Sequence, residues 1–429
     1  MDVNIIAVAT VLAIVAGVIA IAQAAWLLAR RFLLPLEPPI AAKADIDALL
    51  HQISALEQNI AHPSEYLAGL PQALNETLRA AYQEARILQL EGYEAQNADK
   101  HKEAIDRFTR ALGLAENDAQ RAALHILRGN SYEATSDYHK AQNDYRRALQ
   151  LSIDISPAED AAHARATALR NLGTVYASLG QLQPAEESYQ QALQIDRETG
   201  NRLGQAEDLG NLGTVHAQRG DLQRAEQFIR QALEIHQAIG NRLGEAAALS
   251  NLGIVYRHQA DLNRAEQHYK EALQIQRQMN DRAGQARQLG NLGLVYARRG
   301  DLDRAEQHHK QAIEIHRQLD DRLGQAQDLA NLGIVYAERG DLHQAKQYYK
   351  IALDMHRQIG SRLGEANALA NLGRVAEEQG DLKQARELLG EALAIYEQSA
   401  AGGPGPQIIR RALARIEEQK RQQPQPPQE

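Results

Sequence analysis

Six asparagines recur at intervals of 40 residues along this chain, and each begins the tripeptide Asn-Leu-Gly. A side-chain amide carries both a hydrogen-bond donor and an acceptor, so a row of amides can bind the N–H and C=O groups of an extended polypeptide of any sequence. Alternatively, each amide bonds a neighbouring helix and only orders the stack; both interpretations stay open at this point. The six residues are Asn171, Asn211, Asn251, Asn291, Asn331 and Asn371.

A second set of side chains lies three residues after each asparagine, about one helical turn further on. These residues are Thr174, Thr214, Ile254, Leu294, Ile334 and Arg374. Together they give a presumed groove a polar start, an apolar middle and a charged end. The residue before the asparagine is small in all units but the first, where it is Arg170, and this leaves room for a ligand. We therefore expect a partly apolar, extended ligand.

Residue types that serve catalysis or metal binding are present without a suitable arrangement. The chain has no cysteine, which excludes disulfides, thiolate metal sites and a cysteine nucleophile. The adjacent His308 and His309 would point about 100° apart on a helix, and no carboxylate-histidine motif accompanies them. Paired acids such as Glu186 and Glu187 lie on periodic polar faces, where solvated surface is expected. We expect no enzyme activity, no cofactor and no metal.

Composition indicates an all-helical protein. Only 4% of the residues are aromatic, while alanine and leucine are prominent among the 44% that are hydrophobic, which suits closely packed helices. The net charge of -8 arises from interspersed acids and bases, without a basic block that would neutralise a phosphate backbone. A nucleic-acid partner is therefore not expected.

The elements that must position the asparagines are predicted by a repeat of 40 residues. Within the unit from residue 321, apolar and small residues recur at the spacing of one helical face, first before Gly340 and again after Asp341. Gly340 suits a left-handed helix end and Asp341 a helix N-cap, so each unit is a helical hairpin. The units begin at Ala161, Asn201, Asn241, Asp281, Asp321 and Ser361.

Small residues at fixed positions predict close approach of the two helices of each hairpin. The first helix carries a glycine after each Asn-Leu pair, and the second carries an alanine at residues 185, 225, 265, 305, 345 and 385. The apolar faces need neighbours to cover them, so the hairpins must stack into a solenoid. Two looser units are expected at 82–160, six regular ones at 161–400, a C-terminal capping helix at 401–420 and a disordered tail at 421–429.

The order of these residues resembles the tetratricopeptide repeat over roughly residues 82 to 400. The matching positions in one unit are Leu332, Gly333, Tyr336, Ala345, Tyr349 and Ala352. The unit has 40 residues rather than about 34, and this longer form is similar to the repeats of kinesin light chains and spindle-orientation scaffold proteins. The resemblance implies a right-handed superhelix of about eight hairpins whose first helices line a concave surface. It further implies a protein or peptide partner there, held by its backbone on the asparagines.

The N-terminal segment predicts a membrane anchor. Residues 5–28 carry no charge, and at about 1.5 Å per residue a helix of this length crosses a bilayer core of roughly 30 Å. Arg30 and Arg31 follow directly, which places the repeats in the cytoplasm of a single-pass membrane protein. We expect the anchor at 1–31 and a proline-rich linker at 32–43.

Amphipathic helices are expected at 44–81, next to the membrane. Apolar residues within 46–60 follow a heptad spacing over two heptads, which fits either a coiled coil that forms a homo-oligomer or a helix packed on the array. Two functions follow from the whole pattern. The first is a membrane-anchored scaffold or adaptor that binds a partner in the groove, and the alternative is a structural protein that self-assembles into a lattice or filament.

Overall fold

The computed structural model describes residues 88–89, 92–93, 95–96, 100–115, 117–153, 155, 158–398 and 405–422. These residues form sixteen helices and no strand, which confirms the predicted all-helical class. No helix among them is long and apolar enough to cross a membrane. The predicted membrane segment at 5–28, the linker at 32–43, the helices at 44–81 with the heptads at 46–60, and residues 423–429 of the tail lie outside the described residues.

The chain divides into two compact units, which are described separately. Unit 1 comprises the described residues of Met1–Ala177 and Gln183–Asn211, and unit 2 comprises Ser178–Leu182 and the described residues of Leu212–Glu429. Unit 1 carries most of helices α5 (His101–Leu114), α6 (Asp118–Ala134), α7 (Tyr138–Leu151), α8 (Ala158–Ser178) and α9 (Leu182–Glu198). Helix α10 (Arg202–Gln218) is divided between the two units at Asn211.

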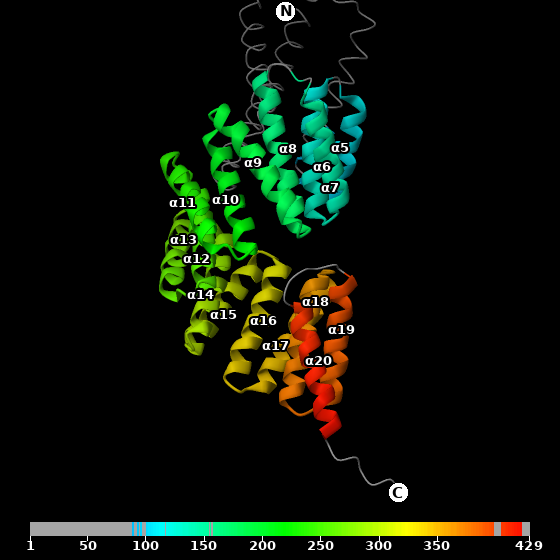
Figure 1. The fold of residues 1–429 in the computed structure, drawn as a ribbon, viewed down its shortest axis with the longest axis vertical. Coiled ribbons are helices and arrows are strands. Elements are labelled where there is room, and N and C mark those ends of the chain that lie inside the picture. The colour runs from blue at the N-terminus through cyan, green and yellow to red at the C-terminus, as the bar shows by residue number, and fades with distance from the viewer. Residues whose placement is uncertain are drawn as a thin grey trace, which may run out of the picture. The chain divides into compact units, whose positions relative to one another are not determined.

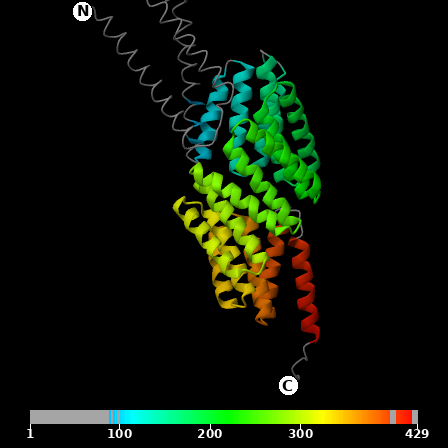
Figure 2. The same cartoon turned by 90° about the vertical axis from the view of Figure 1, so that its left-hand side faces the viewer.

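Unit 2 is a regular stack of antiparallel helix pairs in chain order. The two views show these helices lying side by side, from green through yellow to red (Figures 1 and 2). Its helices are α11 (Leu222–Ala238), α12 (Arg242–His258), α13 (Leu262–Gln278), α14 (Arg282–Arg298), α15 (Leu302–Gln318), α16 (Arg322–Glu338), α17 (Leu342–Gln358), α18 (Arg362–Glu378), α19 (Leu382–Gln398) and α20 (Gly405–Gln422). In each 40-residue hairpin the even-numbered helix is the first and the odd-numbered helix the second.

The turns between helices form as the sequence predicts, with one exception. Gly340 ends α16 at a φ of 80°, and the Asp341 carboxylate accepts a hydrogen bond from the Gln344 amide at 2.9 Å. At the start of α18, Ser361 makes no such side-chain cap. Ala260 occupies the left-handed position that is glycine after most other first helices, with a φ of 62°. That position is strained because a Cβ crowds the carbonyl in this conformation.

The small residues permit the close packing that was predicted. A Cβ added to Gly333 would lie 2.5 Å from the ring of Tyr349, and one added to Gly293 would lie 2.5 Å from the His309 ring. In unit 1 the looser hairpin has the same contact, between Gly129 and the Tyr145 ring, at 2.6 Å. The alanines that recur every 40 residues on the second helices are fully buried; they are Ala185, Ala225, Ala265, Ala305, Ala345 and Ala385.

The first helices of unit 2 form one layer and the second helices another. Helix α14 contacts α16 and α16 contacts α18, whereas no pair of second helices described in this unit approaches as closely. Arg298 of α14 also donates to the backbone oxygen of Arg257 in α12, at 3.1 Å. A curved stack brings its inner layer together, so the first helices line the concave side of unit 2.

Helix α20 packs against α19 at the end of the array. It buries Ile409, Ala412 and Ile416, and the exposed Arg415 donates two hydrogen bonds to Glu377 of α18, at 2.8 and 3.0 Å. The last hairpin therefore has its apolar face covered.

Candidate functional site: the asparagine groove

The asparagines of unit 2 lie on an accessible stripe that runs along each first helix. On one face of α14, Arg287, Asn291, Leu294 and Arg298 are accessible, at spacings of 4, 3 and 4 residues. Asn291 and Leu294 are half-buried in the middle, and the two arginines are exposed at the ends. The same four positions are accessible on α12, α16 and α18. We call these four parallel stripes the asparagine groove.

The first asparagine differs from the others in its hydrogen bonds. The Asn171 amide donates to the side-chain oxygen of Asn130 at 3.0 Å, and Asn130 also accepts a hydrogen bond from Tyr145. Asn171 thus orders unit 1, as the alternative interpretation proposed. Among the described residues, no side-chain hydrogen bond is made by Asn211, Asn251, Asn291, Asn331 or Asn371. Their half-exposed donors and acceptors are available to a ligand.

The side chains one turn further on divide in the same way. Thr174 in unit 1 accepts a hydrogen bond from Tyr189 at 3.1 Å and donates one to a backbone oxygen at 3.2 Å. In unit 2, Ile254, Leu294 and Ile334 are half-buried, and Thr214 and Arg374 are exposed. The structure therefore keeps the apolar middle and charged end of the predicted groove, while Asn171 and Thr174 are engaged inside unit 1.

Among the residues that precede the asparagines, Gly210 has open space beside it, with nothing within 4 Å of an added Cβ, whereas Gly290 and Arg170 contact neighbouring hairpins. Gly290 faces the next first helix, because a Cβ there would lie 2.9 Å from the Asp328 carboxylate. Arg170 is largely buried in unit 1, where it pairs with Asp196 and with Asp208 at 2.7 Å. Burial raises the pKa of Asp208 to about 7, and the facing Arg170 guanidinium offsets only part of that rise. Arg170 therefore holds neighbouring hairpins together, and Gly290 permits their close approach.

The histidines that were weighed as metal ligands have structural contacts. His309 is fully buried and its Nδ1 lies 2.8 Å from Asp328, which His316 also approaches at 3.5 Å. Burial raises the pKa of Asp328, but hydrogen bonds from the two histidines outweigh burial, and the pKa is lowered overall. His308 stacks on Tyr296 with ring centroids 5.2 Å apart. In the described part of the chain, no group of three histidines or acids is placed to hold a metal ion.

Sequence reasoning missed the outer positions of each stripe. The residues four before the asparagine are Ala247, Arg287, Gln327 and Asn367, and those seven after it are His258, Arg298, Glu338 and Glu378. All eight are exposed. The 4-3-4 spacing around each asparagine is the signal that would have found them, since it marks one helical face. They give α14 a basic stripe and leave α16 and α18 with acidic ends.

Stacked helical hairpins with a lined inner face place the protein among the α-solenoids. The model of the tetratricopeptide repeat matches residues 120–198, 205–278, 284–358 and 331–398, which is more than half of the 429 residues. The chain belongs to the tetratricopeptide-repeat family. No curated protein sequence matches it, and the finer likeness to kinesin light chains stays a prediction.

Solved structures of similar fold include three Rap proteins. The apo form of RapI is 18% identical with a TM-score of 0.54, covering 65% of this chain and 99% of RapI. The Rap conjugation gene regulator of plasmid pLS20, in complex with the Phr* peptide, is 18% identical with a TM-score of 0.53, covering 75% and 96%. A Rap protein complexed with competence and sporulation factor is 14% identical with a TM-score of 0.53, covering 79% and 98%. At these identities the likeness concerns the fold.

Proposed function

We propose that the protein is a non-enzymatic scaffold that binds an extended peptide or helix of a partner protein in the asparagine groove of unit 2. One observation carries this proposal: Asn251, Asn291, Asn331 and Asn371 stand on successive inner helices without an intramolecular hydrogen bond among the described residues. Half-buried polar groups that lack a protein partner are satisfied by water or by a ligand. Spaced amides suit a ligand that presents backbone groups at regular intervals.

The lining of the groove indicates the character of the ligand. Ile254, Leu294 and Ile334 offer apolar contacts beside three of the amides, so the ligand carries apolar side chains in its middle. The basic stripe of α14 favours a carboxylate near Arg287 or Arg298. A fold of this kind holds a peptide in the Rap regulator of plasmid pLS20, which supports a peptide ligand here.

Affinity capture with the full chain in detergent tests this proposal. Replacing Asn251, Asn291 and Asn331 by alanine together should abolish partner capture and leave the helical circular-dichroism signal unchanged. Asn171→Ala is the matched control, because Asn171 bonds within unit 1 and its loss should not affect capture. Retained capture by the triple variant would refute the groove. Recovery of the chain's own copies alone would favour the self-assembling lattice.

We further propose that residues 5–28 hold the protein in a membrane with the repeats on the cytoplasmic side. The support is the uncharged apolar run and the arginine pair that follows it. A C-terminal alkaline phosphatase fusion should be inactive and a C-terminal fluorescent protein active in intact cells. The reverse pattern would contradict the orientation, and extraction of the chain by alkaline carbonate would contradict the anchor.

A further inference from the structure

Three successive hairpin junctions of unit 2 share one side-chain arrangement. A glutamate on the second helix accepts a hydrogen bond from a tyrosine hydroxyl on the next first helix, and the O···O distances are 2.6, 2.6 and 2.7 Å. The pairs are Glu226 with Tyr256, Glu266 with Tyr296, and Glu306 with Tyr336. Each tyrosine thus bridges consecutive hairpins.

Further contacts fill the same three junctions. Each tyrosine ring stacks on a ring of the following second helix, with centroid separations of 5.3, 5.2 and 5.2 Å. Glu306 also accepts hydrogen bonds from Lys310, four residues later, and from Arg339. Burial raises the pKa of Glu306, yet these partners and Tyr336 outweigh it and lower the pKa to about 2. A fixed negative charge therefore lies at each of these junctions.

The fourth junction, between α17 and α18, lacks the glutamate, the tyrosine and the stacked ring of this arrangement. Lys346 replaces the glutamate, Ala376 replaces the tyrosine and Leu388 replaces the stacked ring. Lys350 is retained, so two ammonium groups now stand at i and i+4 where the other junctions have an acid and a base. Like charges at this spacing destabilise a helix, whereas the opposite pair stabilises it. A like-charge pair kept at a helix position where an ion pair would be more stable is typical of a functional position.

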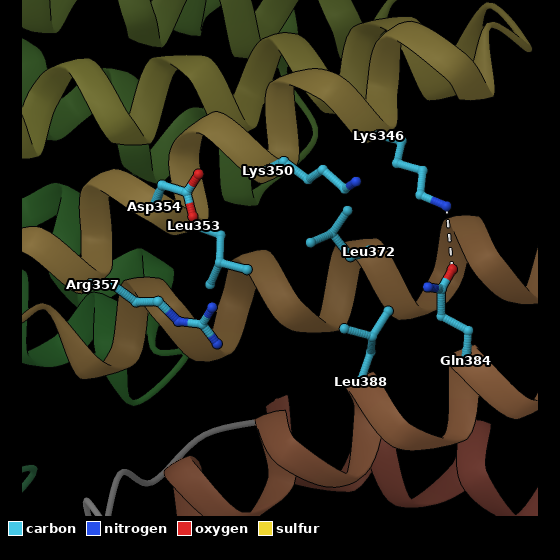
Figure 3. A pocket seen from close by; sticks show the side chains of 8 residues that line it. All are labelled: Lys346, Lys350, Leu353, Asp354, Arg357, Leu372, Gln384 and Leu388. Atoms are coloured by element: carbon cyan, nitrogen blue, oxygen red, sulfur yellow. Dashed lines mark hydrogen bonds between the residues drawn. The ribbon is translucent and has the colours of Figure 1, made fainter.

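A pocket of about 260 Å³ lies at this junction, between α17, α18 and α19 (Figure 3). Its apolar lining consists of Leu353, Leu372 and Leu388. Lys346 and Lys350 extend over the same opening from α17.

The two lysines make no ion pair with an acid among the described residues, although the Asp354 carboxylate, four residues after Lys350, also lines the pocket. The Lys346 ammonium is half-buried and donates to the neutral side-chain oxygen of Gln384 at 3.2 Å, and Lys350 is exposed without an ion pair in the described chain. Arg357, at the pocket edge, is already paired with Glu365 and Glu391, each at 2.9 Å. A half-buried ammonium group that bonds only a neutral amide favours a negatively charged ligand.

We propose that this pocket docks an acidic peptide segment of a partner protein, with an apolar side chain on the leucines and flanking carboxylates on Lys346 and Lys350. An apolar lining beside two positive charges matches a leucine or isoleucine with acidic neighbours. A lone phosphate is matched better by a free arginine fork or by backbone amides, and the one arginine of the pocket is engaged. The pocket is formed by α17 and α19 together with Leu372 of α18, and none of its lining residues belongs to the asparagine groove, so both sites can be occupied.

Fluorescence anisotropy with the full chain in detergent tests the docking of such a peptide. The probe is a fluorescein-labelled peptide, Glu-Asp-Leu-Glu-Asp, which should bind with an affinity that falls as salt is added. Two control peptides should each bind at least about tenfold more weakly. The isosteric Gln-Asn-Leu-Gln-Asn lacks the carboxylates that would pair with the lysines, and Glu-Asp-Ser-Glu-Asp lacks the apolar side chain that would contact the leucines. The triple asparagine variant should bind the probe normally, so failure here is distinguishable from failure of the groove.

Lys346→Glu is the decisive variant. It restores the glutamate-lysine pair of the other hairpins, so the protein should fold with an unchanged or higher melting temperature, while probe affinity falls about tenfold. Lys310→Gln, at the position equivalent to Lys350 in the preceding hairpin, is the control that should bind normally. Leu388→Tyr, the residue type found at 348, should fill the pocket and also prevent binding.

Four outcomes would overturn the proposal. They are no probe binding by the wild-type chain, equal binding by Lys346→Glu, equal binding of the neutral peptide, and equal binding of the serine peptide. The last outcome, together with displacement of the probe by inorganic phosphate, would identify a simple anion site instead.

Discussion

The junction between α15 and α16 and the junction between α17 and α18 have the same backbone plan and opposite side-chain chemistry. At the first, Glu306 and Tyr336 close the space between hairpins with a hydrogen bond of 2.7 Å. At the second, Lys346 and Ala376 stand in their places, and Lys346 and Lys350 line a pocket. The close-packed glycines and alanines are common to both, so the helices stay in place when the junction residues change. The difference shows that one set of residues, the close-packed glycines and alanines, builds the array. The junction residues form a second set, which can change without altering the arrangement of the helices.

The first prediction concerns the close helix packing that the two junctions share. Gly333→Leu places a branched side chain where even a Cβ would lie 2.5 Å from the Tyr349 ring, so unit 2 should lose about 3 kcal/mol of stability in urea unfolding. Gly390→Ala is the control, because nothing lies within 4 Å of an added Cβ and the helix gains from a less flexible unfolded chain. An unchanged unfolding midpoint for Gly333→Leu would contradict the packing of all the hairpins.

The second prediction concerns the acid sensitivity of the closed junctions. The pKa values of Glu266 and Glu306 are lowered from 4.5 to about 2, so folding favours their ionised forms. Their contribution is complete above about pH 4.5 and is lost as the pH falls through about 2. The variant Glu266→Gln/Glu306→Gln should be about 2 kcal/mol less stable at pH 7 and less sensitive to acid. Parallel pH profiles for variant and wild type would refute the assignment.

The third prediction converts the open junction into a closed one. The double variant Lys346→Glu/Ala376→Tyr should form the hydrogen bond seen between Glu306 and Tyr336, and so raise unfolding free energy by about 1 kcal/mol. Thermal melting and urea unfolding measure this gain, and Ala376→Tyr alone is the comparison that lacks the acceptor. A double variant less stable than the wild type would show that Ala376 is required for packing.

The smallest expected effect concerns a turn rather than a junction. Ala260 has a φ of 62°, where an L-residue costs about 1–2 kcal/mol, while glycine costs about 0.5–1 kcal/mol in unfolded-state entropy. Ala260→Gly should therefore stabilise unit 2 by about 0.5 kcal/mol. Gly300→Ala, at the equivalent turn with a φ of 78°, should destabilise it by a similar amount. Equal shifts of the same sign would contradict the strain at this turn.

Much of the array was predictable because its rules are local. The helical faces of α16 and α17, the left-handed Gly340 and the Asp341 cap each depend on residues no more than a few positions apart. The Gly333 contact was predictable from residue size alone. Ser361 is the local exception, because it stands at a cap position and makes no cap hydrogen bond. The membrane segment at 5–28 and the oligomerising heptads at 46–60 stay predictions.

The sequence by itself determined that the chain forms helical hairpins, where they begin and end, and that asparagines recur on their first helices, because the repeat period and turn residues act within each unit. Only the tertiary structure decided which of those asparagines is used internally. Asn171 is bonded because Asn130 lies 41 positions away in the chain but 3.0 Å away in space, whereas Asn331 has no hydrogen-bond partner among the described residues. The pocket likewise depends on the contact of α17, α18 and α19, because its lysines and leucines come from all three helices. The repeat pattern alone does not distinguish these helices from the corresponding helices of the other units.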